Sequence, residues 1–142
     1  MSMSNYLEVE IRKHLFRTGS WTKPTVLAVS LHTADPTDVT AVAAANEIPH
    51  LFGYERVQRD PGDANWSGAS ATDGLTDNVA AIAYPAPSGG NWGVATHAAL
   101  WDSATYGAGN LLLYGPLAAP KTINDGDPQP VFPAGALDAI FQ

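Results

Sequence analysis

The first segment of the chain has the spacing of apolar residues that is typical of an amphipathic helix. The apolar positions recur every fourth residue and are widened by one aromatic residue: Leu7, Ile11, Leu15 and Phe16. Asn5 is the predicted N-cap, Glu8 stands where a capping box places its acid, and Gly19 offers a stop. We therefore predict a helix over residues 4–18. Because a short helix is marginally stable alone, its apolar stripe must pack on its own domain or on a neighbouring subunit.

Beyond this helix, short runs of apolar and β-branched residues alternate with turn residues, which indicates strands. Residues 24–33 predict a buried strand that ends at a turn over residues 34–38, and residues 92–101 predict a second long strand. The run at residues 116–120 is expected to be an edge or irregular strand, because proline cannot donate to a sheet ladder. The other predicted strands lie at residues 53–57, 78–84, 111–114, 129–133 and 137–141.

This order of elements predicts a mostly-β fold, a jelly-roll-like antiparallel β-sandwich of about seven or eight strands with one N-terminal helix. The 142 residues suffice for one domain with a hydrophobic core. We expect a single domain over residues 1–142, with a helix or arm over residues 1–20 and the β-sandwich over residues 21–142. The 13 glycines and 11 prolines, against only 15% charged residues, agree with many turns that join short strands.

The charge balance narrows the choice of partners. Seven Lys and Arg residues face 14 Asp and Glu residues, a net charge of −7, which argues against nucleic acid as a partner. The basic residues Arg12, Lys13 and Arg17 cluster near the N-terminus, either as a solvated helix face or as a contact patch for an acidic partner. No stretch has the length and apolarity of a membrane span or a signal peptide, so we expect no membrane role and assembly in the cytoplasm of the producing cell.

The sequence carries no motif that is specific for catalysis or metal binding. There is no cysteine, and no Gly-x-Ser-x-Gly elbow is present. The four histidines lack the close spacing of metal ligands: His14, His32, His50 and His97. His97 is the best candidate for a buried core histidine. The paired Asp residues at 60–63 and 125–127 are interpreted as turn residues, with a structural Ca²⁺ ion as the alternative. We therefore expect no enzymatic activity, no metal and no cofactor.

Aromatic residues are the remaining candidates for recognition. They stand in predicted strands and loops: Tyr54, Trp66, Tyr84, Trp92, Trp101, Tyr106 and Tyr114. We interpret them as core residues or as anchors of a protein interface, with stacking on sugar rings as the alternative.

Several segments, in their order along the chain, together resemble a family of small virion structural proteins of tailed phages. The resemblance begins with an Asn-Tyr-Leu-Glu helix start, an apolar strand and an Ala-Asp-Pro-Thr-Asp turn, at residues 5–8, 26–33 and 34–38. The later matching segments include an acid followed by a Gly-Tyr-x-Arg run and extend to the C-terminal region: Glu47, 53–56, Asn78, 92–102, 109–117, Lys121, 126–127 and 132–137. Residues 60–77 are longer and more acidic than the family pattern, so no contact is carried over there.

Proteins of this kind are labelled either capsid cement (decoration) proteins or tail fibre proteins, and the resemblance implies a non-catalytic role in the virion. We expect a cement protein that binds the major capsid protein on the outer capsid surface, stabilises the head and forms a homo-oligomer, a dimer or a trimer. The alternative is a tail fibre or a receptor-binding or adaptor protein of the tail. The expected interface residues lie on the helix and in two loops: Tyr6, Leu7, Ile11, Leu15, Phe16, Arg56 and Trp66.

Overall fold

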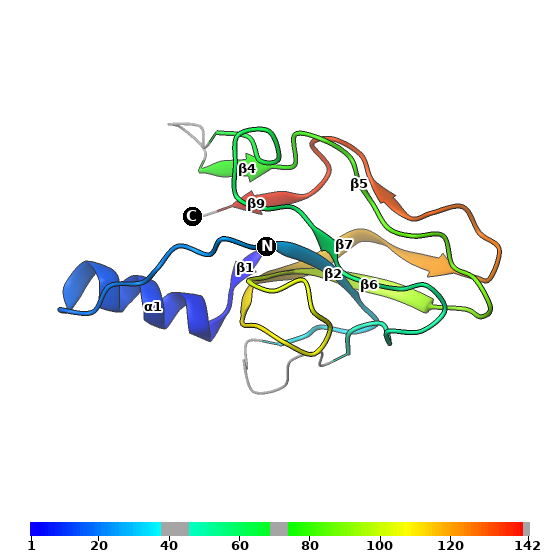
Figure 1. Ribbon diagram of the computed structural model, residues 1–142, viewed down its shortest axis with the longest axis horizontal. Coiled ribbons are helices and arrows are strands. Elements are labelled where there is room, and N and C mark those ends of the chain that lie inside the picture. Colours follow the sequence, from blue (N-terminus) through cyan, green and yellow to red (C-terminus); the bar gives the residue numbers. More distant parts are fainter. Residues whose placement is uncertain (38–45, 69–73, 141–142) are drawn as a thin grey trace.

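The computed structural model describes residues 1–37, 46–68 and 74–140. Along this part of the chain one helix and nine strands follow one another (Figure 1): β1 (Ser2–Met3), α1 (Asn5–Phe16), β2 (Ala28–His32), β3 (Val57–Gln58), β4 (Leu75–Asp77), β5 (Ile82–Ala83), β6 (Gly93–Trp101), β7 (Leu111–Ile123), β8 (Val131–Phe132) and β9 (Asp138–Ile140). Asp38 and Phe141, which belong to a predicted turn and to the last predicted strand, lie outside the described residues.

The strands form one five-stranded antiparallel sheet and two short ribbons. The sheet has the order β1-β7-β6-β2-β3, and the ribbons are β4-β9 and β5-β8. Figure 1 shows the ribbons in a second layer over the sheet. This arrangement confirms the predicted fold class, mostly β with an N-terminal helix, and is consistent with a β-sandwich.

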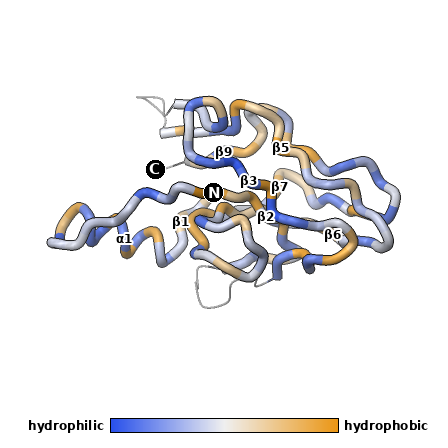
Figure 2. The backbone as a smooth tube through the Cα atoms, in the orientation of Figure 1, coloured by the Kyte–Doolittle hydropathy of each residue, from blue (hydrophilic) through white to orange (hydrophobic). Residues whose placement is uncertain are grey.

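The main hydrophobic core fills the space between the two layers. It includes alternate residues of β2 and β6, such as Val29, Leu31, Ala98 and Leu100, together with Ile82 of the β5-β8 ribbon. These residues point to one face because side chains alternate along a strand. The five-stranded sheet accordingly contains some of the most hydrophobic stretches of the chain (Figure 2).

The predicted helix is present, but its N-cap differs from the prediction. Ser4, and not Asn5, is the N-cap: its Oγ accepts a hydrogen bond from the backbone N–H of Leu7 at 3.2 Å and donates to the carbonyl oxygen of Leu111. Both residue types cap helices well, so a shift of one position is invisible to sequence rules. Ser4 is fully buried, and its hydrogen bond to Leu111 fixes the start of α1 to strand β7.

Strands β2 and β6 fall where they were predicted, whereas β7 is longer than expected. It runs without a break through Pro116 and Pro120, which were assigned to a separate edge strand. Register shifts in the β6–β7 ladder between Ala95 and His97 accommodate this stretch. On its other side, β7 pairs with β1 only through residues 113 and 114, so its second half lies at an edge, as its prolines require.

The two ribbons are joined by a buried asparagine. The side-chain oxygen of Asn78 accepts hydrogen bonds from the backbone N–H groups of Ala136 and Leu137, and its amide donates to the carbonyl oxygens of Ala80 and Pro133. Asn78 is 1% exposed, and these four bonds satisfy the side-chain amide. Of the predicted strand at residues 78–84, Ile82 and Ala83 form β5.

Candidate functional site

The face of the sheet opposite the main core buries polar side chains. Ser30 and His32 of β2 point to this face, and the antiparallel register places Ala99 and His97 of β6 opposite them. Trp101 also lies on this face. Ser30 and His32 are both fully buried, so each must find its hydrogen-bond partners inside the protein.

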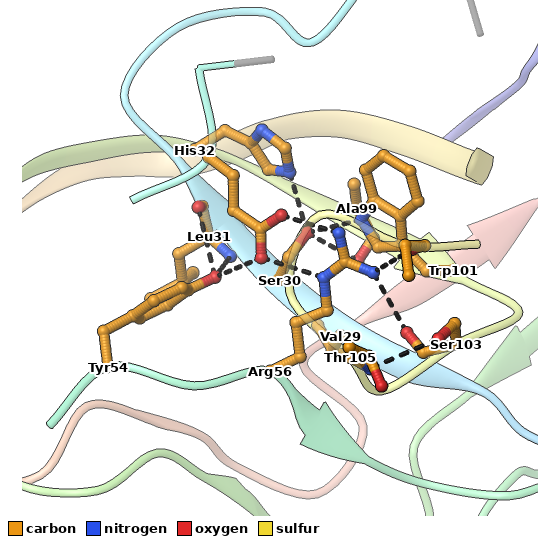
Figure 3. Close-up of polar contacts among 12 residues, drawn as sticks. Val29, Ser30, Leu31, His32, Tyr54, Arg56, Ala99, Trp101, Ser103 and Thr105 are labelled. Atoms are coloured by element: carbon orange, nitrogen blue, oxygen red, sulfur yellow. Dashed lines mark hydrogen bonds and ion pairs between the residues drawn. The ribbon is translucent and has the colours of Figure 1, made fainter. Parts of the chain in front are cut away.

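A buried ion pair closes this face. Arg56 donates from Nε to Oε1 of Glu47 at 2.9 Å and from Nη2 to Oε2 at 2.7 Å, a bidentate arrangement in which both side chains are 0% exposed. Its Nη1 donates to the carbonyl oxygens of Ser103 and Ala108 at 3.0 and 2.8 Å. The pair therefore fixes three segments of the chain to one another (Figure 3).

Trp101 links the ion pair to β2. The guanidinium carbon of Arg56 lies 4.1 Å from the Trp101 ring centroid, a cation–π contact. The indole N–H donates to Ser30 Oγ at 2.8 Å, and Ser30 Oγ lies 2.7 Å from Nε2 of His32. His32 is fully buried, whereas His97 is half-buried. The prediction that His97 is the buried core histidine is therefore wrong. The two residues are cross-strand neighbours, and on its other side His32 forms an isolated antiparallel β-bridge with Glu47.

Tyr54 completes the buried network. Its hydroxyl accepts a hydrogen bond from the backbone N–H of Leu31 at 2.9 Å and donates to Glu47 Oε1 at 3.1 Å. Burial, reinforced by the negative charge of Glu47, raises the pKa of Tyr54 far above its ordinary value, and the same two causes raise the pKa of Tyr84. Both phenols therefore stay neutral across the physiological pH range.

This network has the chemistry of a structural clamp. The side chains of its ion pair are 0% exposed, and their hydrogen-bonding groups are used within the chain. Among the residues that the structure describes, no group of three or more His, Asp or Glu side chains could hold a metal ion. We call Glu47, Arg56, Tyr54 and Trp101 the buried clamp.

An open groove borders the buried clamp at Arg56, which is one of its lining residues. It has a volume of ≈ 810 Å³ and is lined on one side by the stacked rings of His50 and Tyr106, whose centroids are 5.7 Å apart. Polar side chains complete it, among them Gln58, Arg59 and Gln129. Aromatic faces beside amide and guanidinium groups offer both stacking and hydrogen bonding to a polar ligand.

The helix residues that were predicted to make contacts divide along α1. Leu7 is buried, and Tyr6 and Ile11 pack against the main core. Leu15 and Phe16, at the other end, are 66% and 79% exposed. The first turns of the stripe therefore pack on their own domain, and the last turn is left open to solvent.

The two predicted loop contacts are held within the chain. Arg56 belongs to the buried clamp and has no exposed side-chain surface. Trp66 is half-buried, and its indole N–H donates to the carbonyl oxygen of Arg59 at 3.0 Å. Both residues therefore position loops, and neither is a freely exposed anchor.

The sequence prediction missed Glu47, Tyr54 and Trp101 as one group. A signal was available: an acid and an arginine stand beside buried apolar residues in a chain with few charges, which favours a buried pair. Nothing in the spacing of Glu47 and Arg56 reveals that loop residues 103–108 supply the remaining acceptors.

Comparison with known proteins identifies the family. No curated protein matches the chain. Within the described residues, no helix is long and apolar enough to cross a membrane. The family model described as "Podophage GP4 fiber I protein gp80" matches residues 2–140, nearly the whole chain. The chain therefore belongs to the podophage GP4 fiber I protein gp80 family, and so to the virion structural proteins of phages.

Proposed function

We propose that this protein is a non-catalytic subunit of a phage tail fibre, which acts by docking onto other virion proteins. The observation that carries this proposal is the family match over residues 2–140, whose description names a fibre protein. The buried clamp agrees with it, since its ion pair is 0% exposed and holds loops together.

The family description supports the tail fibre alternative better than the expected capsid cement role. A cement protein would occupy the outer capsid surface and contact the major capsid protein in many copies. A fibre subunit would be present in few copies and would contact other tail proteins or a second copy of itself.

The location and copy number of the chain in purified particles test the proposal. Gold-labelled antibodies against the protein should mark the tail in electron micrographs. Quantitative mass spectrometry should find far fewer copies than of the major capsid protein. Label over the whole head, with copies in the hundreds, would refute the fibre role and restore the cement role.

A second candidate function is contact with saccharides, and the open groove favours it. The stacked rings of His50 and Tyr106 offer an aromatic platform, and Arg59 and Gln129 offer hydrogen-bonding groups for sugar hydroxyls. A glycan array of bacterial surface saccharides should give binding that is lost in Tyr106→Ala and kept in Val94→Ala, an exposed residue outside the groove. Equal signals for the two variants would rule the groove out.

A further inference from the structure

The charges of the chain are divided unequally between the N-terminal arm and the body. Residues 1–23 contain four Lys and Arg residues and two Glu residues, a net charge of +2. Residues 24–142 contain three Lys and Arg residues and 12 Asp and Glu residues, a net charge of −9. Two copies of this chain can therefore attract each other when the arm of one meets the body of the other.

The outer end of α1 has the features of a docking segment. Figure 1 shows α1 extending away from the sheet. Leu15 and Phe16 lie at this end with 66% and 79% of their surface exposed, and the exposed basic residues Arg12 and Arg17 flank them. Large side chains that insert into a pocket, together with arginines, are typical anchors of protein interfaces.

A recess of matching character lies on the other side of the molecule. It has a volume of ≈ 360 Å³ between the second half of β7 and strand β8, both far from α1 in Figure 1. Its lining is mainly apolar and includes Leu117, Ala118, Val131 and Phe132. Val131 is 43% exposed, so the recess is open to solvent.

The turn that leads from β7 to the lining residues before β8 carries two carboxylates. Asp127 directly precedes Pro128, a lining residue, and Asp125 lies in the same turn after β7. Lys121 is the charged residue of the lining itself, and the two carboxylates lie beside the lining in the adjoining turn. The exposed carboxylate of Asp125 accepts one hydrogen bond, from the backbone N–H of Gly89 at 2.9 Å, and keeps capacity for a further donor.

We propose that the outer end of α1 of one copy docks into the β7–β8 recess of a second copy. Phe16 and Leu15 fill the apolar recess, and Arg12 and Arg17 approach Asp125 and Asp127. The two surfaces differ, so the contact is heterologous: each copy keeps a free arm or a free recess, and repetition gives a linear or ring-shaped assembly. This inference deepens the proposed fibre role and rests on it.

Sedimentation equilibrium of the full chain over a range of concentrations tests the contact. The wild-type chain should form dimers and higher species, and raising the salt concentration should weaken them. Phe16→Ala and Val131→Lys should each weaken the association about 30-fold or more, the effect of losing an interface hot spot. Val94→Lys is the matched control, because Val94 is also 43% exposed but does not line the recess. Circular dichroism checks that each variant is folded.

Mixing the two weakened variants gives the decisive result. The Phe16→Ala chain keeps an intact recess and the Val131→Lys chain keeps an intact arm, so a heterologous contact restores one heterodimer at wild-type affinity. A symmetric contact between two α1 helices would not be restored, and it would not respond to Val131→Lys. Either result overturns the inference, and so does a wild-type chain that stays monomeric at all concentrations.

The particle experiment separates this inference from the proposed function. If the chain is found in the tail but does not associate with itself, only the docking contact fails. If the docking contact holds but the chain is found over the whole head, the fibre role fails.

Discussion

Replacing Glu47 with Gln is the sharpest test of the buried clamp. The substitution keeps the shape of the side chain and removes its charge, while the guanidinium of Arg56 stays buried with 0% exposure. The two carbonyl oxygens of Ser103 and Ala108 remain as acceptors, but neither carries a full charge. An uncompensated buried charge of this kind costs about 3–5 kcal/mol. That is a large fraction of the about 5–15 kcal/mol that stabilises a typical domain.

Urea unfolding, followed by tryptophan fluorescence, measures this free energy of unfolding. The midpoint should fall while the slope with denaturant stays the same, because the surface exposed on unfolding does not change. Arg56→Met should cost a similar amount, since it leaves the Glu47 carboxylate buried with Tyr54 as its remaining side-chain donor. The double variant Glu47→Gln/Arg56→Met should lose less than the sum of the two single variants, with a coupling of about 1–3 kcal/mol.

The exposed ion pair of the helix provides the control. Glu10 and Lys13 lie 2.8 Å apart, with side chains 20% and 52% exposed, so Glu10→Gln should cost less than about 1 kcal/mol. The reasoning is refuted if Glu47→Gln costs no more than Glu10→Gln. It is also refuted if the two substitutions at the buried pair prove additive.

Three further predictions address alkaline stability, the helix cap and the loop that contacts Arg56. Burial raises the pKa values of Tyr54 and Tyr84 above 10.0 in the folded state. The stability that the two neutral phenols contribute is therefore complete below pH 10 and is lost above it, by up to about 1.4 kcal/mol per pH unit for each phenol. Urea titrations between pH 9 and 11 should show this decline, and Tyr84→Phe should make it less steep. Ser4→Ala should cost about 1–2 kcal/mol in thermal or urea unfolding, because it removes both the helix cap and the bond to strand β7, and an unchanged stability would contradict the cap. Gly109→Ala should destabilise the protein more than Gly107→Ala does. Both residues have positive φ, but only a Cβ at position 109 would meet other atoms, the nearest being Ser103 Cβ at 2.5 Å. Equal losses of stability in urea unfolding would show that the loop yields freely.

The helix and the two long strands β2 and β6 were predictable because each has a local signal, whereas β1 and β4 were not predicted. The apolar stripe gave α1, and the β-branched and apolar runs gave β2 and β6. Strand β7 was split in the prediction because Pro116 and Pro120 are local signals against a strand, and only the ladder with β6 overrides them. The segment 53–57 was predicted to be a strand, but Tyr54 and Arg56 belong to the buried clamp. Only Val57 and Gln58 pair with β2.

The buried clamp was beyond local rules for a physical reason. His32 and His97 stand in similar apolar runs, yet His32 is fully buried and pairs with Glu47 in an isolated β-bridge, whereas His97 is half-buried. Arg56 was assigned to a surface contact because isolated arginines are mostly exposed. Its burial depends on a carboxylate nine residues away and on two carbonyl oxygens about fifty residues away, which no short pattern encodes.

The prolines of β7 bear on how such a protein behaves when many copies are crowded together. Pro116 and Pro120 are exposed in the stretch that β1 leaves uncovered, and neither has an N–H group for a strand from another molecule. A long unprotected margin would invite edge-to-edge pairing and runaway aggregation. Pro116 and Pro120 disfavour such strand pairing at this edge of β7. Contacts between copies are therefore expected to be made through side chains, whose shape and charge can be selective.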